Sequence, residues 1–172
     1  MASLAGVESV HARFKEEKHL EILDEPLVMT GELRYRAPHY LEKRTLQPHP
    51  ERYELDGDWL VVETPDQGRR HIALRGAAPL RALVEAIRAT LAGDLATLRR
   101  YYRIRADGRA EDWTLNLEPV DAQVSGYVSA LVIKGRRDRV VSVETREADG
   151  DRGLLTLEQS DGEQPDGEQP DG

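Results

Sequence analysis

The sequence contains no cysteine. That absence excludes disulfide frameworks, thiolate catalysis, cysteine zinc sites and lipid attachment through an N-terminal cysteine. No stretch approaches the roughly 18 consecutive apolar residues of a membrane-spanning helix, so we do not expect an integral membrane protein. Aromatic residues make up only 5% of the chain. Few bulky side chains are therefore available to fill a large interior.

Charge is distributed unevenly along the chain. Of the 172 residues, 32 are acidic and 24 are basic, which gives a formal net charge of −8. The last fifteen residues hold six of the acids and no base, so the remainder is nearly balanced. The basic residues are scattered, with pairs at Arg69–Arg70 and Arg99–Arg100, and form no dense stretch interleaved with aromatics. Nucleic acid is therefore not an expected partner.

The two ends of the chain differ from its body. From Asp161 the sequence reads DGEQPDGEQPDG, and such Gly, Pro and acidic residues cannot repay the entropy of ordering. We therefore predict one folded domain over residues 1–158 and a disordered acidic tail over 159–172. Residues 1–6 lack the charged start and apolar stretch of a secretory signal. A mature sequence preceded by an initiator methionine would look the same.

Most of the body follows a period of two, which is typical of half-buried antiparallel strands. In residues 31–36, for example, Leu33 and Tyr35 alternate with arginines. Short turns such as Asp56-Gly57-Asp58 separate the alternating segments, so sequence neighbours should pair antiparallel. Strands are predicted at 14–23, 31–36, 41–46, 52–55, 59–63, 69–75, 102–106, 113–117, 128–133, 140–144 and 154–157.

One segment follows the helical period of 3.6 instead. Between Pro79 and Leu91 the large aliphatic residues fall on one stripe, and Gly93 suits the helix end. Asp94 suits the start of a second, shorter helix that ends near Tyr101. The sequence therefore predicts a large curved antiparallel sheet with a pair of helices inserted near the middle of the chain.

Catalytic and metal-binding patterns find no support. The histidines have none of the short spacings that a zinc site uses; they are His11, His19, His39, His49 and His71. No serine has a Gly-x-Ser-x-Gly setting, and no glycine-rich phosphate loop is present. We therefore expect no enzyme, no metal site and no cofactor.

The aliphatic stripe of the longer helix has two interpretations. The helix can cover one face of the sheet and complete the core, as most amphipathic helices do. Alternatively, it forms a lid over a concave apolar sheet. Short aliphatic side chains do not fill the space inside a strongly curved sheet, so a hydrophobic ligand would occupy it.

Several segments resemble the LolA family of periplasmic lipoprotein carriers. They are Gly31-Glu-Leu-Arg-Tyr-Arg-Ala-Pro38 with the Gln47-Pro48 turn, Val10-His-Ala-Arg-Phe14, Asp56-Gly-Asp-Trp-Leu60 and residues 137–157. The stretches 38–46, 89–94 and 112–115 resemble the LolA-like branch associated with aryl-polyene and fatty-acid-like gene clusters. The resemblance covers residues 7–158. It implies a mainly β fold, an unclosed antiparallel β-barrel with an α-helical lid, in the periplasm.

The resemblance carries no lid latch to this chain. The family's lipoprotein carriers have an arginine directly before the Pro38 position, where this sequence has Ala37. Arg36 is expected to point to the opposite face of its strand. How the lid is held is therefore left open by the sequence.

The resemblance and the helical stripe together favour a non-enzymatic periplasmic carrier. It would be a monomer that shuttles a lipid-like or acylated cargo between an inner-membrane donor and an outer-membrane acceptor. The alternative is a periplasmic protein-binding or sensing module with the same fold and no lipid cargo. The expected hydrophobic cargo-binding residues are Phe14, Leu33, Tyr35, Leu60, Leu80, Leu83, Val84, Ile87, Leu91 and Leu115.

Overall fold

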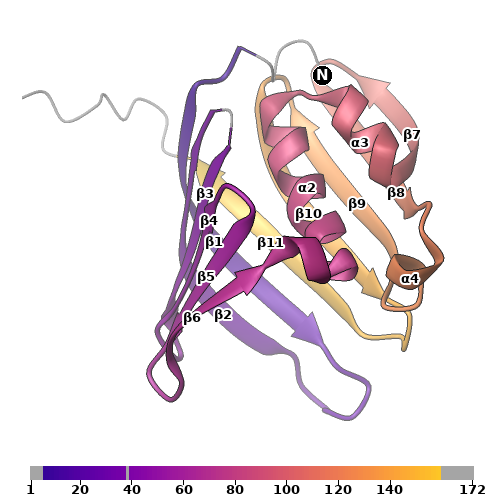
Figure 1. Ribbon diagram of the computed structural model, residues 1–172. Coiled ribbons are helices and arrows are strands. Elements are labelled where there is room, and N and C mark those ends of the chain that lie inside the picture. Colours follow the sequence, from indigo (N-terminus) through magenta and orange to yellow (C-terminus); the bar gives the residue numbers. More distant parts are fainter. Residues whose placement is uncertain (1–5, 38, 160–172) are drawn as a thin grey trace, which may run out of the picture.

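The computed structural model describes residues 6–37 and 39–159. Almost all of the predicted tail, and with it the predicted disorder, lies outside these residues. The dominant feature is one antiparallel sheet of eleven strands (Figure 1). The strands are β1 (Ser9–His19), β2 (Leu27–Arg36), β3 (Tyr40–Gln47), β4 (Glu51–Asp56), β5 (Trp59–Thr64), β6 (Gly68–Ala73), β7 (Tyr102–Arg109), β8 (Asp112–Pro119), β9 (Val128–Arg136), β10 (Arg139–Glu147) and β11 (Arg152–Gln159).

The order of the strands explains why the barrel is unclosed. The sheet runs β6-β5-β4-β3-β2-β1-β11-β10-β9-β8-β7, so the first and last strands of the chain pair in its interior. The two edges are β6 and β7, and the helices lie between these strands in the sequence. The chain therefore leaves the sheet at one edge, forms the helices, and re-enters the sheet at the other edge. The predicted unclosed antiparallel sheet with inserted helices is confirmed.

The helices form where the sequence predicts them. After the short 3-10 turn η1 (Leu74–Gly76), α2 (Ala78–Ala92) has Pro79 in its first turn. It ends at Gly93, whose left-handed backbone lets its N–H bond the last turn. In α3 (Leu95–Tyr101), the Asp94 side chain accepts a hydrogen bond from the Thr97 N–H at 3.1 Å. Figure 1 shows α2 lying across the concave side of the sheet.

Three details differ from the sequence prediction. Strand β1 begins at Ser9 and ends at His19, whereas the predicted strand covered 14–23. Ile22, expected on a strand face, is 90% exposed in the following turn. A short helix, α4 (Ala122–Ser125), was not predicted, although Asp121 caps it through the Gln123 N–H at 2.8 Å. Four residues show too little periodicity for a sequence pattern to reveal a helix.

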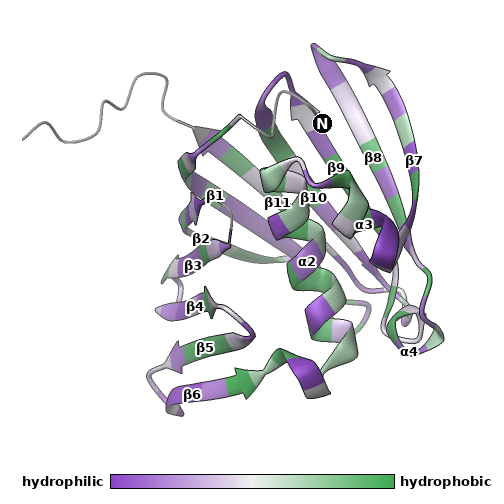
Figure 2. Ribbon diagram, turned by 45° about the horizontal axis from the view of Figure 1, so that its top comes forward, coloured by the Kyte–Doolittle hydropathy of each residue, from purple (hydrophilic) through white to green (hydrophobic). Residues whose placement is uncertain are grey.

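The core lies on the concave face, and strand alternation builds it. On β1, Val10, Ala12 and Phe14 are buried, while the intervening residues are exposed. Phe14 pairs with Gly31 of β2, and a side chain at Gly31 would collide with the Phe14 ring and the Arg44 carbonyl oxygen. Figure 2 shows this alternation of hydrophilic and hydrophobic residues along the strands and along α2.

Candidate functional site

An apolar cavity, here called the inner cavity, lies between the concave face of the sheet and α2. Its volume is about 350 Å³, which is within the range of small-molecule binding pockets. One wall comes from α2 and the others from β1–β5 and β9–β11. The aliphatic residues that line it are Leu20, Leu33, Leu41, Leu55, Leu60, Leu80, Leu83, Val84, Ile87, Leu91, Ile133, Val140, Val143, Leu155 and Leu157.

The helical wall follows directly from the 3.6-residue period. Five aliphatic residues of α2, from Leu80 to Leu91, point into the inner cavity. Ala82, Ala86 and Ala89 form a separate buried stripe of small side chains on the same helix. The hydroxyl of Tyr102 on β7 donates to the Ala82 carbonyl oxygen, which ties α2 to this edge of the sheet.

Charged side chains also line the inner cavity. Lys43 Nζ lies 2.9 Å from Glu16 Oε1, and the same ammonium lies 5.2 Å from the centre of the Phe14 ring. Lys18, Glu147, Asp151 and Arg152 are also among its lining residues. An elongated ligand could thus place an apolar chain among the aliphatic residues and a polar group beside these charges.

The sequence profile of the "Outer membrane lipoprotein carrier protein LolA-like" family matches residues 1–162. The chain belongs to the LolA-like family. No curated protein has significant sequence similarity to it. The family assignment confirms the resemblance seen in the sequence.

Solved structures with similar folds share little sequence with the chain. A LolA superfamily protein from Nitrosomonas europaea is 11% identical, with a TM-score of 0.45 and coverage of 92% of this chain and 89% of its own. A domain from Vibrio parahaemolyticus named for outer membrane lipoprotein sorting is 12% identical, with a TM-score of 0.47 and coverage of 95% and 90%. MucB, solved in a complex with MucA, is 14% identical, with a TM-score of 0.41 and coverage of 94% and 54%.

In the part of the LolA-like chain that the structure describes, no helix is long and apolar enough to cross a membrane. The longest helix, α2, has 15 residues. It also carries Arg81, Glu85 and Arg88 opposite its apolar stripe.

The structure brings seven of the ten predicted cargo-binding residues to the inner cavity. They are Leu33, Leu60, Leu80, Leu83, Val84, Ile87 and Leu91. Phe14, Tyr35 and Leu115 are buried but are not among its lining residues. Leu115 pairs with Ile133, which does line the cavity, and so lies one strand further toward the β7 edge. Cargo binding by any of the ten remains a prediction.

Sequence reasoning missed the lining residues on the neighbouring strands. Leu41 and Leu55, which were not predicted, form one row with the predicted Leu60 across β3, β4 and β5 because the strand register places them opposite one another. Val143 and Leu155 are paired in the same way on β10 and β11. Leu55 and Val143 each lie between polar residues, which is a sequence signal for an inward-facing position. Only the register shows which rows meet at the cavity.

Two buried tyrosines on the concave side differ in their bonding. Burial raises the pKa of Tyr102, whose hydroxyl is bonded to α2. The Tyr35 hydroxyl is also buried but has no hydrogen-bond partner in the described residues. Burial raises the pKa of Tyr35 as well, and the charge of Arg88 opposes that rise. A buried hydroxyl without a hydrogen bond destabilises the fold, and an apolar side chain at this position would avoid that loss of free energy.

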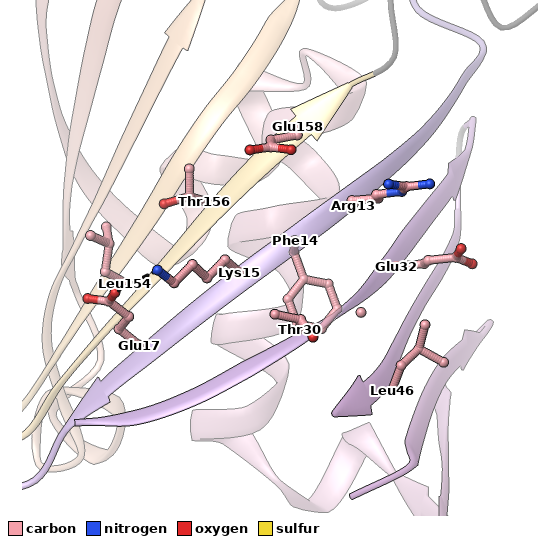
Figure 3. A pocket seen from close by; sticks show the side chains of 11 residues that line it. Arg13, Phe14, Lys15, Glu17, Thr30, Glu32, Leu46, Leu154, Thr156 and Glu158 are labelled. Atoms are coloured by element: carbon pink, nitrogen blue, oxygen red, sulfur yellow. Dashed lines mark ion pairs between the residues drawn. The ribbon is translucent and has the colours of Figure 1, made fainter. Parts of the chain in front are cut away.

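A second hollow, here called the outer groove, lies on the convex face of β1, β2 and β11 and has a volume of about 580 Å³. Figure 3 shows Arg13 and Lys15 extending from β1, with Thr156 and Glu158 on β11. Lys15 pairs with Glu17 at 3.3 Å. Although the outer groove is larger, its lining is mostly charged or hydroxylated. It is therefore less suited to an apolar ligand than the inner cavity.

Three carboxylates meet at the turn between β10 and β11. One oxygen each of Glu147, Asp149 and Asp151 lies within 4.8 Å of the others. Asp151 accepts a hydrogen bond from the Glu21 N–H at 3.0 Å, and Asp149 accepts one from the Asp151 N–H at 3.0 Å. The geometry of the turn accounts for this cluster.

Proposed function

We propose that this LolA-like protein carries a hydrophobic, acylated or lipid-like molecule in the inner cavity. It would act in the periplasm as a monomer that moves its cargo from an inner-membrane donor to an outer-membrane acceptor, without catalysis. The aryl-polyene or fatty-acid-like class is the candidate cargo that the sequence resemblance suggests. The observation that carries the proposal is the continuous aliphatic lining of the inner cavity.

The volume of the inner cavity supports an occupant. Left dry and empty, an apolar space of about 350 Å³ would cost up to about 8 kcal/mol at roughly 24 cal/mol per Å³. That figure is an upper bound because the cavity is open to water at its mouth. It is nevertheless comparable with the whole stability of a small domain. A bound acyl chain would remove this cost.

The contacts in such a complex would be non-directional. Burying each methylene of a ligand contributes about 0.8 kcal/mol, so affinity should rise about fourfold per methylene until the inner cavity is full. Release would require α2 to move away from the sheet. Helix α2 is therefore the proposed lid, and its five aliphatic residues are the proposed lid contacts.

A protein-binding or sensing module remains the alternative from the sequence. Its mark would be an exposed apolar patch of several hundred Å² without an internal cavity. The inner cavity favours the carrier.

The proposal predicts that Ile87→Glu abolishes uptake of a fluorescent acyl probe, because a carboxylate would have to be buried among aliphatic side chains. Ala96→Glu is the matched control, since Ala96 is exposed on α3 and receives the same charge outside the cavity. Leu83→Trp is a second variant that fills the cavity without adding charge. Uptake is measured by fluorescence titration, and folding by circular dichroism.

Unchanged uptake in folded Ile87→Glu and Leu83→Trp would remove α2 as the lid. The cargo itself is best sought by native mass spectrometry of protein taken from its own periplasm, followed by solvent extraction. A co-purifying acyl, polyene or lipid species would support the carrier. A clean apoprotein from cells that make the candidate cargo would contradict it.

A further inference from the structure

Helix α2 also has a charged side, separate from the stripe that lines the inner cavity. A hollow of about 220 Å³, here called the arginine pocket, lies beside α2 and α3. Its charged lining residues are Arg81, Glu85, Arg88, Asp94 and Arg100, and Tyr101 and His39 of the β2–β3 turn also line it. Arg100 and His39 are exposed, so this hollow opens to solvent. Side chains from the helices and from the rim of the sheet thus meet at one site.

The arginine pocket retains unused hydrogen-bond donors. Arg81 Nε donates to the Tyr101 hydroxyl at 3.1 Å, which leaves that hydroxyl proton free for another acceptor. Arg88 is paired with Glu85 on the same helix. Among the described residues Arg100 has no ion pair, although it lies near the Asp94 carboxylate. Arg100 and the free edge of Arg81 can therefore bind an anion.

The local charge is opposite to that of the whole chain. Among the residues that line the arginine pocket, three arginines outnumber two acids, Glu85 and Asp94, whereas the complete chain has a net charge of −8. Arginine presents a planar set of N–H groups that matches phosphate oxygens in a bidentate way, which lysine does not. Arg81 and Arg100 therefore offer the arginine pocket N–H groups whose geometry suits a phosphate.

We propose that the arginine pocket docks the protein onto an anionic phospholipid surface, with headgroup phosphates bound by Arg81, Arg100 and Tyr101. This inference deepens the proposed carrier function by naming the surface at which cargo is exchanged. Docking by this face would bring α2, whose other side covers the inner cavity, against the lipid.

A net charge of −8 does not prevent such docking. At physiological ionic strength, electrostatic interactions are screened over about 8 Å. A membrane that touches α2 and α3 therefore interacts with the arginines beside it far more strongly than with acids elsewhere. An acidic protein without a built cationic site would instead be repelled by the same membrane, so binding is a sharp test.

The test is co-sedimentation of the full chain with vesicles, without cargo. The protein should bind vesicles of phosphatidylglycerol and phosphatidylcholine, should not bind vesicles of phosphatidylcholine alone, and should dissociate between about 50 mM and about 500 mM salt. Arg100→Gln should weaken binding about fivefold, and Arg81→Gln with Arg100→Gln about 25-fold.

The matched control is Arg105→Gln. Arg105 lies on edge strand β7, its side chain is 77% exposed and it pairs with Asp107 at 3.6 Å. The substitution removes the same charge outside the arginine pocket, and binding should stay within about twofold of wild type. An equal loss in Arg105→Gln and Arg100→Gln would overturn the docking site.

Two further outcomes would also overturn the inference. Equal binding to both kinds of vesicle, or to neither, would exclude an anionic membrane and leave an acidic protein surface as the partner to seek. Displacement of vesicles by millimolar glycerol phosphate would assign the arginine pocket to a soluble phosphate ester. Acyl-probe uptake measured without vesicles separates the two proposals. Uptake should be the same in the double variant as in the wild type. If the wild type takes up no probe, the carrier proposal fails and the docking proposal is unaffected.

Discussion

Strand β3 carries charged residues on both of its faces, and the two faces hold them differently. On the convex face, Glu42 is 6% exposed. Its carboxylate accepts hydrogen bonds from Arg52 Nε at 3.0 Å and from the Tyr40 hydroxyl at 3.2 Å. On the concave face, Lys43 pairs with Glu16 at 2.9 Å, and both side chains line the inner cavity.

The convex group is an extended network. Arg52 also contacts Glu54, and it lies 3.7 Å from Glu63, which in turn lies 3.7 Å from Arg69. Strands β3, β4, β5 and β6 are therefore linked from the interior of the sheet to its free edge. Every charge in this network faces another protein group, whereas the concave pair faces a cavity. The convex charges therefore support the sheet, whereas the concave charges lie where a ligand can reach them.

The largest effect is expected from breaking the convex network at its centre. Arg52→Met would leave Glu42 buried without its hydrogen-bonded guanidinium and should lower the free energy of unfolding by about 3 kcal/mol. Urea denaturation followed by circular dichroism measures the loss. Arg44→Met is the control, because Arg44 lies 3.8 Å from Glu42 with its side chain 48% exposed and should cost at most about 1 kcal/mol. Similar losses in both variants would contradict the central role of Arg52.

A smaller effect should appear in the pH dependence of stability. Burial raises the pKa of Glu42, but the hydrogen bond and charge of Arg52, with the Tyr40 hydrogen bond, outweigh it and hold the pKa below its ordinary value. Because the folded-state pKa is depressed, this stabilisation is complete above that value and is lost as pH falls through the folded pKa.

Glu42→Gln tests this titration. At neutral pH the variant should be less stable than wild type by about 1–2 kcal/mol, and the difference should shrink as pH falls from about 5 to about 3. Glu111→Gln, in the exposed β7–β8 turn, should stay within about 0.5 kcal/mol of wild type at neutral pH. A difference for Glu42→Gln that is constant with pH would show that the lost contacts matter and the charge does not.

The same strand shows what the sequence could predict. Residues 41–46 were predicted as a short strand, and β3 spans Tyr40–Gln47. This prediction did not show that Glu42 is buried, because acids at alternate positions usually face water. That burial depends on Arg52 and Tyr40, and Arg52 lies on the next strand, opposite Arg44. The strand register thus buries a face of β3 that the sequence alone suggests is exposed to solvent.

The candidate site was predictable to a similar extent. The five aliphatic residues of α2 lie on one stripe that the 3.6-residue period reveals, and all five line the inner cavity. Phe14 was expected in the wall, but its ring packs against Gly31 and under Lys43. The period of two shows which face of the sheet a residue lies on, but not whether that part of the face borders the cavity. The arginine pocket could not be predicted from the sequence for another reason. Arg81 and Arg100 line one hollow only because α3 folds back on α2.

The smallest effect on stability is expected from replacing the concave pair. In Glu16→Leu with Lys43→Met, both charges are exchanged together for apolar groups, so no unpaired charge is left and stability should stay within about 1 kcal/mol of wild type. The wall of the inner cavity becomes more apolar, and an acyl probe without a charged headgroup should bind about fivefold more tightly.

Lys43→Met alone is the control, because it leaves Glu16 unpaired. No such exchange is available on the convex face, where Arg52 serves three carboxylates. A stability loss as large as that of Arg52→Met, or weaker probe binding, would mean that the concave pair supports the sheet as the convex network does.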